Sequence, residues 1–153
     1  MAFNLKSLFV KNSADEERRG DDRIRLPSEA TILIVDDSRT AIAVLKKVLE
    51  STGYTILSAL NAEEGIEVAK AHQPDLILMD IVMPGLNGFQ ATRILRKEAE
   101  TADIPILIIS GNEQATEKFW SMRVGANGFL AKPVDRSVLF HLMREHLANA
   151  QVV

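Results

Sequence analysis

The sequence contains no cysteine, which excludes a disulfide framework and any metal site built on thiolates. It also lacks an apolar run close to the ~18 residues that a membrane-spanning helix requires, so we expect no integral membrane segment. Residues 1–10 have no long apolar core followed by a small-residue cleavage site, and without a signal peptide the expected location is cytoplasmic. A net charge of −3 indicates no broad basic surface, so nucleic acid is not an expected partner.

Hydrophobic residues make up 46% of the 153 residues, which is enough for one globular core. Residues 12–30 depart from this pattern, because they are rich in charge and poor in apolar side chains. We therefore predict a flexible N-terminal extension over residues 1–30, one domain over residues 31–148 and a C-terminal tail over residues 149–153. Residues 1–11 combine several apolar side chains with two lysines. They form either a short amphipathic helix that docks on a surface or an unstructured start.

From Thr31 onward, short apolar runs alternate with segments of helical periodicity. Strands are predicted at residues 31–35, 54–59, 76–80, 106–110 and 128–131. Helices are predicted after a Ser38 cap up to Gly53, after an Asn61 cap, at residues 87–98, at residues 113–124 and after an Asp135 cap. Glu64 lies three residues beyond Asn61, which predicts a capping box. The alternation predicts an α/β fold: a doubly wound, flavodoxin-like, five-stranded parallel sheet of order 2-1-3-4-5 with helices on both faces.

Polar side chains stand at the ends of four predicted strands. Asp36 and Asp37 follow the first strand, Asp80 closes the third, Ser110 closes the fourth and Lys132 follows the fifth. Each alone has an ordinary explanation as a helix cap, a turn residue or a surface charge. Because the carboxyl ends of parallel strands share one edge of the sheet, we expect all five to converge on one pocket.

Three converging carboxylates repel one another unless a cation neutralises them. Oxygen ligands with no cysteine or histidine nearby suit Mg²⁺. A carboxylate in such a pocket is a nucleophile toward phosphorus, and the product is an acyl phosphate. Lys132 and the Ser110 hydroxyl, which we expect to be the nearest free donor, then hydrogen-bond the phosphoryl oxygens.

These motifs resemble the receiver domain of two-component response regulators, the CheY-like family. The resemblance covers residues 31 to about 148 and rests on the Asp36-Asp37 pair, the run from Leu78 to Gly88 around Asp80, Ser110, and Lys132-Pro133. Residues 78–93, 98–101 and 118–120 resemble more narrowly the twitching-motility (type IV pilus) regulators of the PilH type. The resemblance implies a stand-alone receiver with no output domain, which switches protein–protein binding in motility, chemosensory or pilus control.

The resemblance also implies a role for each site residue. Asp80 is the phosphoacceptor, supplied by a sensor histidine kinase, with a CheA-like kinase as one candidate. Asp37 is a direct Mg²⁺ ligand and Asp36 a ligand through water. The Val82 backbone carbonyl is a further ligand to the metal, and Lys132 contacts the phosphoryl group. Pro133 is expected to follow a cis peptide bond. Ser110 and Phe129 are the pair of switch residues.

The expected target surface comprises residues 106–110, 113–124, 128–131 and the last helix, with Trp120 and His141 as candidates for its exposed part. Phe129 stands where the family often has tyrosine, so it has no hydroxyl to hold it outward, and its inward position is expected to be populated before phosphorylation. The protein is not expected to be an enzyme beyond its own phosphorylation and dephosphorylation.

Three alternatives remain. A receiver of this kind also serves as a phosphate sink for a kinase that acts on another regulator. A degenerate receiver serves only as a docking module. A phosphatase of the haloacid-dehalogenase type uses a similar pocket but needs a second aspartate two residues after the nucleophile, where this chain has Val82.

Overall fold

The computed structural model describes residues 30–151. The predicted extension over residues 1–29 and the last two residues therefore lie outside the described residues, as does the side chain of Trp120. The described chain alternates strands and helices, in the order β1 (Thr31–Val35), α2 (Arg39–Glu50), β2 (Thr55–Ala59), α3 (Ala62–His72), β3 (Leu76–Asp80), α4 (Gly88–Lys97), β4 (Ile106–Ser110), α5 (Glu113–Met122), β5 (Gly128–Ala131) and α6 (Arg136–Gln151).

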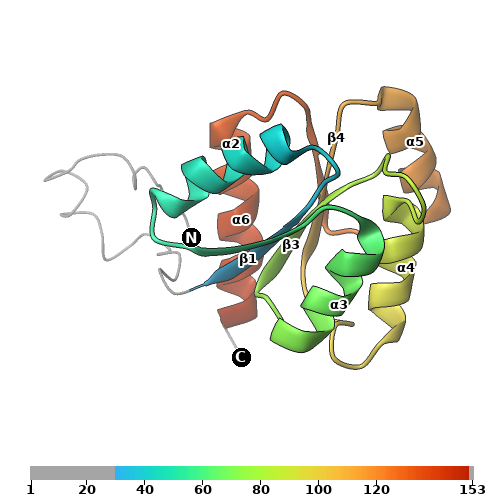
Figure 1. Cartoon of the computed structure of the whole chain (residues 1–153), viewed down its shortest axis with the longest axis horizontal. Coiled ribbons are helices and arrows are strands. Elements are labelled where there is room, and N and C mark those ends of the chain that lie inside the picture. The colour runs from blue at the N-terminus through green and yellow to red at the C-terminus, as the bar shows by residue number, and fades with distance from the viewer. Residues whose placement is uncertain (1–29, 152–153) are drawn as a thin grey trace, which may run out of the picture.

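The strands form one parallel sheet of order β2-β1-β3-β4-β5, which confirms the predicted doubly wound topology (Figure 1). The order reverses between β1 and β3, because the chain moves outward to β2 and then returns past β1. A crevice opens at the carboxyl ends of the strands where such a sheet reverses its order. Val35 pairs with Met79 in the register of β1 and β3, so the residues that follow β1 emerge beside the end of β3.

Two apolar cores, one on each face of the sheet, hold the helices. The odd-numbered side chains of β1 and β3, such as Leu33 and Ile77, pack with α3 and α4. The even-numbered ones, such as Ile34 and Leu78, pack with α2 and α6. Because β3 and β4 are buried along their whole length, both faces of the central strands are apolar and the sequence reads as uninterrupted hydrophobic runs.

Most helix ends follow the predicted capping chemistry. The Ser38 side chain accepts a hydrogen bond from Ala41 N, and Asp135 accepts from Ser137 N and Val138 N. The predicted capping box at Asn61 is only half correct, because Glu64 accepts from Leu60 N. A reciprocal box instead begins α4, where Asn87 and Gln90 each accept from the other's backbone N–H.

Several element boundaries differ from prediction, and α4 begins and ends one residue inside the predicted range 87–98. The second strand begins at Thr55, one residue late, and the first helix ends at Glu50, before the turn that contains Gly53. The helix predicted to reach Val124 ends at Met122, because Arg123 takes a left-handed backbone conformation with φ of 50°. Among the helices of residues 30–151, none has the combination of length and apolarity needed to cross a bilayer.

Arg96 of α4 links loops at the amino-terminal edge of the sheet, which is the edge away from the acidic residues. Its guanidinium donates to the carbonyl oxygens of Ala102, Ile104 and Gly125 and to Asn127 Oδ1, at 2.8–3.1 Å. Asn127 Oδ1 also accepts from Ile106 N, so one side chain joins the segments that enter β4 and β5. Burial lowers the pKa of Arg96.

Gly88 begins α4 in direct contact with the end of β3, because Gly88 N donates to the Ile81 carbonyl at 2.8 Å. A Cβ at this position would lie 2.4 Å from the Asp80 carbonyl oxygen and 2.8 Å from Ile81 Cα. These are backbone atoms, so they cannot rotate away. A side chain here must displace either the helix or the end of the strand.

We predict that Gly88→Ala lowers the free energy of unfolding by about 1–3 kcal/mol, the usual cost of overpacking, despite alanine's better helix propensity. Thermal unfolding followed by circular dichroism measures the change. Gly111→Ala is the matched control, because its Cβ would meet only side-chain atoms of Lys132, at 3.6 Å or more. Equal melting temperatures for the two variants would show that the backbone accommodates residue 88.

Candidate acidic site at the carboxyl edge of the sheet

Three carboxylates meet where β1 and β3 end. Asp36 and Asp37 follow β1 directly, and Asp80 is the last residue of β3. One oxygen from each side chain lies within 4.8 Å of the other two. Asp36 is 3% exposed and Asp80 is 7% exposed, whereas Asp37 is open to solvent. The sheet therefore brings the three predicted carboxylates together, with one side of the cluster facing water.

Lys132 brings a positive charge to this cluster from the end of β5. Its Nζ lies 2.9 Å from Asp36 Oδ2 and 3.7 Å from Asp80 Oδ1. The Lys132 backbone N–H donates to the Ser110 carbonyl at 3.0 Å, which extends the pairing of β4 and β5 beyond the strand. The Lys132–Pro133 peptide bond is cis. The ammonium is closer to Asp36 than to Asp80, so Asp36 anchors it.

Both oxygens of Asp36 are engaged by the protein. Oδ1 accepts from Ser38 N at 2.9 Å, and Oδ2 accepts from Lys132. Asp80 Oδ1 accepts from Ile81 N at 3.0 Å. Within residues 30–151, the hydrogen bond and the ion pair described for Asp80 both fall on Oδ1.

The surroundings of Asp80 destabilise the ionised form of its carboxyl. Burial, followed by the nearby charge of Asp36, raises the pKa of Asp80 from 3.8 to about 6, while Lys132 opposes the shift. For Lys132, burial disfavours the charge, but the hydrogen bond to Asp36 and the charge of Asp80 outweigh it and raise its pKa. Lys132 therefore stays protonated, and one ammonium serves two buried carboxylates.

Ser110 lies at the end of β4 and is buried, as its position predicted, but its hydroxyl is not a free donor. Its Oγ accepts from Asn112 N at 3.0 Å and lies 3.4 Å from the Asn112 carbonyl oxygen. The expectation of a free hydroxyl was wrong, because a serine at the start of a turn satisfies the loop that follows it. A new acceptor for this hydroxyl would compete with the Asn112 carbonyl oxygen.

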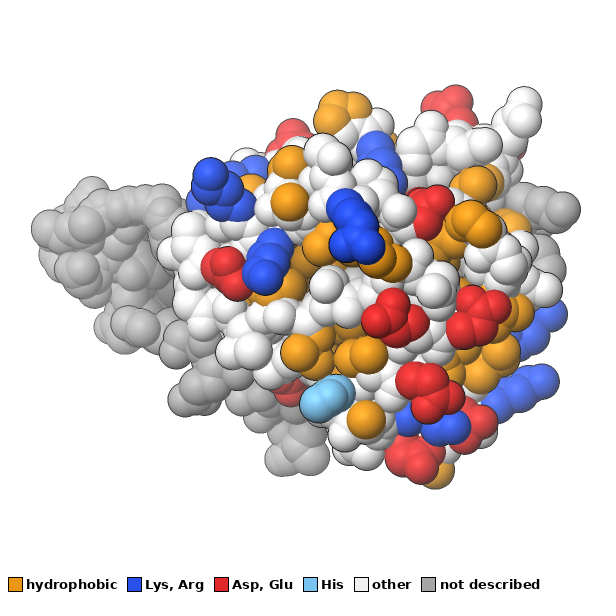
Figure 2. All heavy atoms as spheres, in the orientation of Figure 1, with side chains coloured by type: hydrophobic (Ala, Val, Ile, Leu, Met, Phe, Trp, Pro, Cys, Tyr) orange, Lys and Arg blue, Asp and Glu red, His pale blue; other side chains and the backbone are white. Residues whose placement is uncertain are grey.

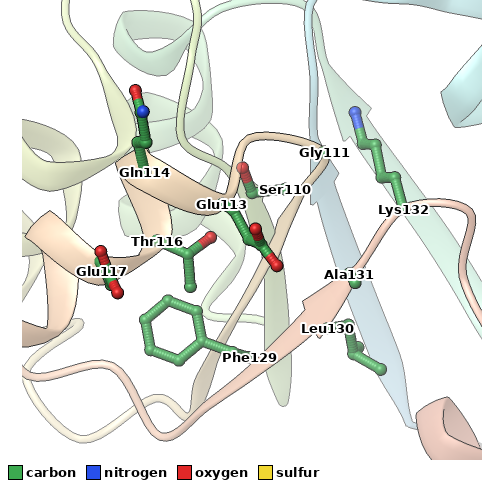
Figure 3. A pocket seen from close by; sticks show the side chains of 10 residues that line it. All are labelled: Ser110, Gly111, Glu113, Gln114, Thr116, Glu117, Phe129, Leu130, Ala131 and Lys132. Carbon is green, nitrogen blue, oxygen red and sulfur yellow. The ribbon is translucent and has the colours of Figure 1, made fainter.

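A cleft of about 630 Å³ adjoins Ser110 on the side of α5. Figure 3 shows the Phe129 ring on the α5 side of β5, with Thr116 and Glu117 beside it, while Leu130 points the other way. The Phe129 side chain is half-buried and packs against the core under α3 and α4. We call this hollow the α5–β5 cleft; its lining residues are Ser110, Gly111, Glu113, Gln114, Thr116, Glu117, Phe129, Leu130, Ala131 and Lys132.

The donor set suits a hard divalent cation. Its three carboxylates offer oxygen ligands close to one another, and Asp37 is open to solvent. Both oxygens of Asp36 already have partners in the protein. Val82 lies in the loop after β3 with its side chain 56% exposed, and its carbonyl ligand role stays a prediction.

Two structural roles near the site were missed from the sequence. Glu63 of α3 accepts from Leu86 N at 3.4 Å and so steadies the loop that contains Val82. Asn112 caps α5, since its Oδ1 accepts from Ala115 N. A capping signal was available for Asn112, an asparagine just before a helix. No local signal was available for Glu63, whose partner lies in a distant loop.

Comparison with known proteins identifies the fold. The family model for the response regulator receiver domain matches residues 32–144. The chain belongs to this family. The receiver domain therefore spans nearly all of the ten elements described above, from β1 into α6.

One curated receiver relative matches along its whole length. Protein PilH of Pseudomonas aeruginosa is 50% identical over 120 residues, which cover 78% of this chain and 99% of PilH. Several other curated relatives are longer proteins, and the chain spans between a quarter and about half of their length.

Two solved receiver structures have the same fold. The chemotaxis protein CheY4 of Vibrio cholerae has a TM-score of 0.71 at 27% identity, covering 77% of this chain and 98% of CheY4. The receiver domain of the sensor histidine kinase PA1611 of Pseudomonas aeruginosa has a TM-score of 0.72 at 28% identity, with 78% and 98% coverage. That crystal structure contains a magnesium ion coordinated in its active-site cleft.

We predict that Asp80→Asn stabilises the metal-free protein at neutral pH by about 1–2 kcal/mol, after discounting the pKa shift for solvent screening. A carboxyl whose pKa is higher in the folded state holds its proton more tightly there than in the unfolded chain. Stability is therefore lost as pH rises from about 4 to 6 in the wild type, and asparagine removes that loss.

Thermal unfolding in EDTA at a series of pH values tests this effect. The gain in Asp80→Asn should shrink as pH falls from 6 toward 4 and vanish below the unfolded pKa of 3.8, where the wild-type carboxyl is protonated in both states. Glu67→Gln, which makes the same chemical change on the exposed surface of α3, should show no such dependence. A gain that is independent of pH would refute the electrostatic cause.

Proposed function

We propose that this protein is a phosphorylation-dependent signalling switch in which Asp80 accepts a phosphoryl group from a sensor histidine kinase. One observation carries the proposal: a buried carboxylate at the end of the central strand, with two further carboxylates and one lysine ammonium around it. Phosphoryl transfer depends on positioning and on charge stabilisation, and this site supplies both.

In the proposed transfer, Asp80 Oδ2 attacks the phosphorus of a phosphohistidine. The new P–O bond forms as the P–N bond breaks, the bonding electrons return to the imidazole nitrogen, and Asp80 becomes an acyl phosphate. The Lys132 ammonium lies 3.7 Å from Asp80 Oδ1, so it is the proposed side-chain donor to a phosphoryl oxygen. Water later attacks the phosphorus and releases phosphate, which restores the carboxylate. The protein thus promotes only its own phosphorylation and dephosphorylation.

Mg²⁺ is the proposed cofactor, and its chemistry is to neutralise the oxygens of the transferring group. Asp37, Asp80 and the Val82 carbonyl would hold it directly, with Asp36 acting through water. The exposed position of Asp37 supports this assignment, because Mg²⁺ retains several of its water ligands. Support also comes from the similar receiver domain whose cleft contains magnesium.

Ser110 and Phe129 are the proposed switch. Once Asp80 has a phosphoryl group, the Ser110 hydroxyl gains a stronger acceptor than the Asn112 backbone. Its turn then opens toward Asp80, and the Phe129 ring moves into the space left beside β4. The surface of β4, α5, β5 and α6 changes with it, and this is the proposed target surface. His141 of α6 is exposed on the described part of that surface.

Control of pilus-based or chemosensory motility is the proposed process, and its support is the 50% identity with PilH along almost the whole of that protein. The phosphate-sink alternative uses the same chemistry and differs only in lacking a target. Val82 argues against a phosphatase, because it stands where such an enzyme needs an acidic residue. The intact group of acidic residues and lysine argues against a degenerate docking module.

Acetyl phosphate with Mg²⁺ is expected to add one base-labile phosphoryl group to the wild type and none to Asp80→Asn, because the amide is not a nucleophile toward phosphorus. Intact-protein mass spectrometry measures the addition. Labelling that persists in Asp80→Asn would place the acceptor elsewhere.

Asp37→Ala is expected to weaken Mg²⁺ binding by about tenfold or more, since it removes a ligand and a charge. Titration calorimetry of the unphosphorylated protein gives the affinity. Asp103→Ala, which removes an exposed carboxylate away from the cluster, is the control. Equal affinities for the two variants would exclude Asp37 as a ligand.

Ser110→Ala is expected to separate phosphorylation from the switch. Asp80 should still be labelled, but beryllium fluoride should no longer shift the NMR resonances of Phe129 and α5 as it does in the wild type. The reason is that alanine has no hydroxyl to follow the phosphoryl oxygen. Shifts of equal size in both proteins would show that the coupling uses another route.

A further inference from the structure

The α5–β5 cleft has the properties of a binding site for an apolar and basic peptide. Its volume of about 630 Å³ falls within the range of roughly 300–1,000 Å³ typical of ligand pockets. Glu113 and Glu117 lie on its α5 side, and both are exposed. Figure 3 shows both glutamates on α5, with the Phe129 ring near Glu117. The Lys132 ammonium does not cancel them, because it is paired with Asp36.

Residues 1–11 of the same chain have the complementary chemistry. They include Phe3, Leu5, Leu8, Phe9 and Val10 with Lys6 and Lys11, and no acidic residue. The match to PilH accounts for 99% of that protein but only 78% of this chain, so part of this chain has no counterpart in that relative. The same chain thus contains an apolar and basic segment and an acid-rimmed cleft with an aromatic ring.

The segment between residues 1–11 and the folded domain is long enough for residues 1–11 to contact the α5–β5 cleft. Residues 12–29 number eighteen. A flexible chain of this length spans about 23 Å on average, and a fully extended one about 60 Å. A folded domain of this size has a radius of gyration of about 14 Å, so residues 1–11 reach any face of it. Linkers of this kind give effective concentrations on the order of 1 mM, at which even weak contacts are populated.

We propose that residues 1–11 bind intramolecularly in the α5–β5 cleft, with their apolar side chains against Phe129 and their lysines against Glu113 and Glu117. The segment then covers part of the surface that we assign to the target and competes with it. This regulatory consequence rests on the proposed function, whereas the docking does not. The acidic surface of α3 is the alternative place for the lysines to bind, because it carries Glu63, Glu64 and Glu67. Figure 2 shows acidic side chains on this part of the surface. The cleft is the better match, because it combines negative charge with a hollow and an aromatic ring.

Paramagnetic NMR on the full chain tests the docking. Because the sequence contains no cysteine, Ser7→Cys provides a single attachment point for a nitroxide label. We expect the label to broaden the amide resonances of residues 113–117 and 128–131 at low salt, relative to the reduced label. Added salt should weaken the broadening by screening the lysine–glutamate attraction. A second label at Asn12→Cys, next to the segment, guards against a label that itself prevents docking.

Matched charge variants decide between the two acidic surfaces. Glu113→Gln with Glu117→Gln should remove most of the broadening, whereas Glu64→Gln with Glu67→Gln should leave it unchanged. Two results would overturn the proposal. One is loss of the broadening in Glu64→Gln with Glu67→Gln but not in Glu113→Gln with Glu117→Gln. The other is uniform broadening over the whole domain with both labels. No phosphoryl donor is present, so a negative result leaves the phosphorylation of Asp80 to be judged on its own test.

Two controls exclude other occupants. In a mixture of labelled protein and isotope-enriched unlabelled protein, broadening of the enriched chain would indicate binding between two copies and would overturn the intramolecular proposal. Vesicles of anionic phospholipid test whether the segment is instead a membrane anchor. Co-sedimentation that depends on Phe3 and Phe9, with no broadening in the cleft, would also overturn it.

Discussion

The contact between Lys132 and the carboxylates of Asp36 and Asp80 is the interaction on which the site depends. Parallel strands bring three acidic side chains to one edge of the sheet, and the apolar packing that fixes the strands also fixes those charges. A single ammonium, contributed by the last strand, makes the arrangement tolerable. Burial, and after it the charge of Asp36, still raises the pKa of Asp80, and three carboxylates outnumber the one ammonium. The remaining negative potential is what favours a divalent cation there.

The neighbouring strands and helix α4 fix the position of Asp80. The Asp80 backbone lies between two buried strands, and α4 begins in contact with it through Gly88. Neither the strand nor the helix can move without disturbing the other. The loop after Ser110, in contrast, borders a cleft, and hydrogen bonds between Ser110 and Asn112 close its first turn. Packed backbone thus surrounds Asp80 on one side of the site, while the other side borders a hollow.

The fold and the convergence of the site were predictable from the sequence for a simple reason. Apolar runs such as Leu76–Met79 determine which segments are buried strands, and parallel pairing then places every strand end at the same edge. The partners of each polar atom were not predictable. The Glu64 side chain accepts from Leu60 N and not from Asn61 N, and the Ser110 hydroxyl accepts from Asn112 N in its own turn. Arg96 joins three segments through contacts that depend on the positions of loops. Such choices depend on angstrom-scale geometry, which residue types alone do not specify.

The 96 residues that separate Asp36 from Lys132 have a consequence for synthesis on the ribosome. The ribosome makes β1 and β3, with the acidic residues at their ends, before it makes Lys132. A nascent chain that paired β1 with β3 at that stage would bring the three carboxylates together without the ammonium that balances them. Divalent cations in the surrounding solution are available to fill the gap. The last strand thus completes the charge balance as well as the core, and folding of the central sheet is expected to become secure only when that strand arrives.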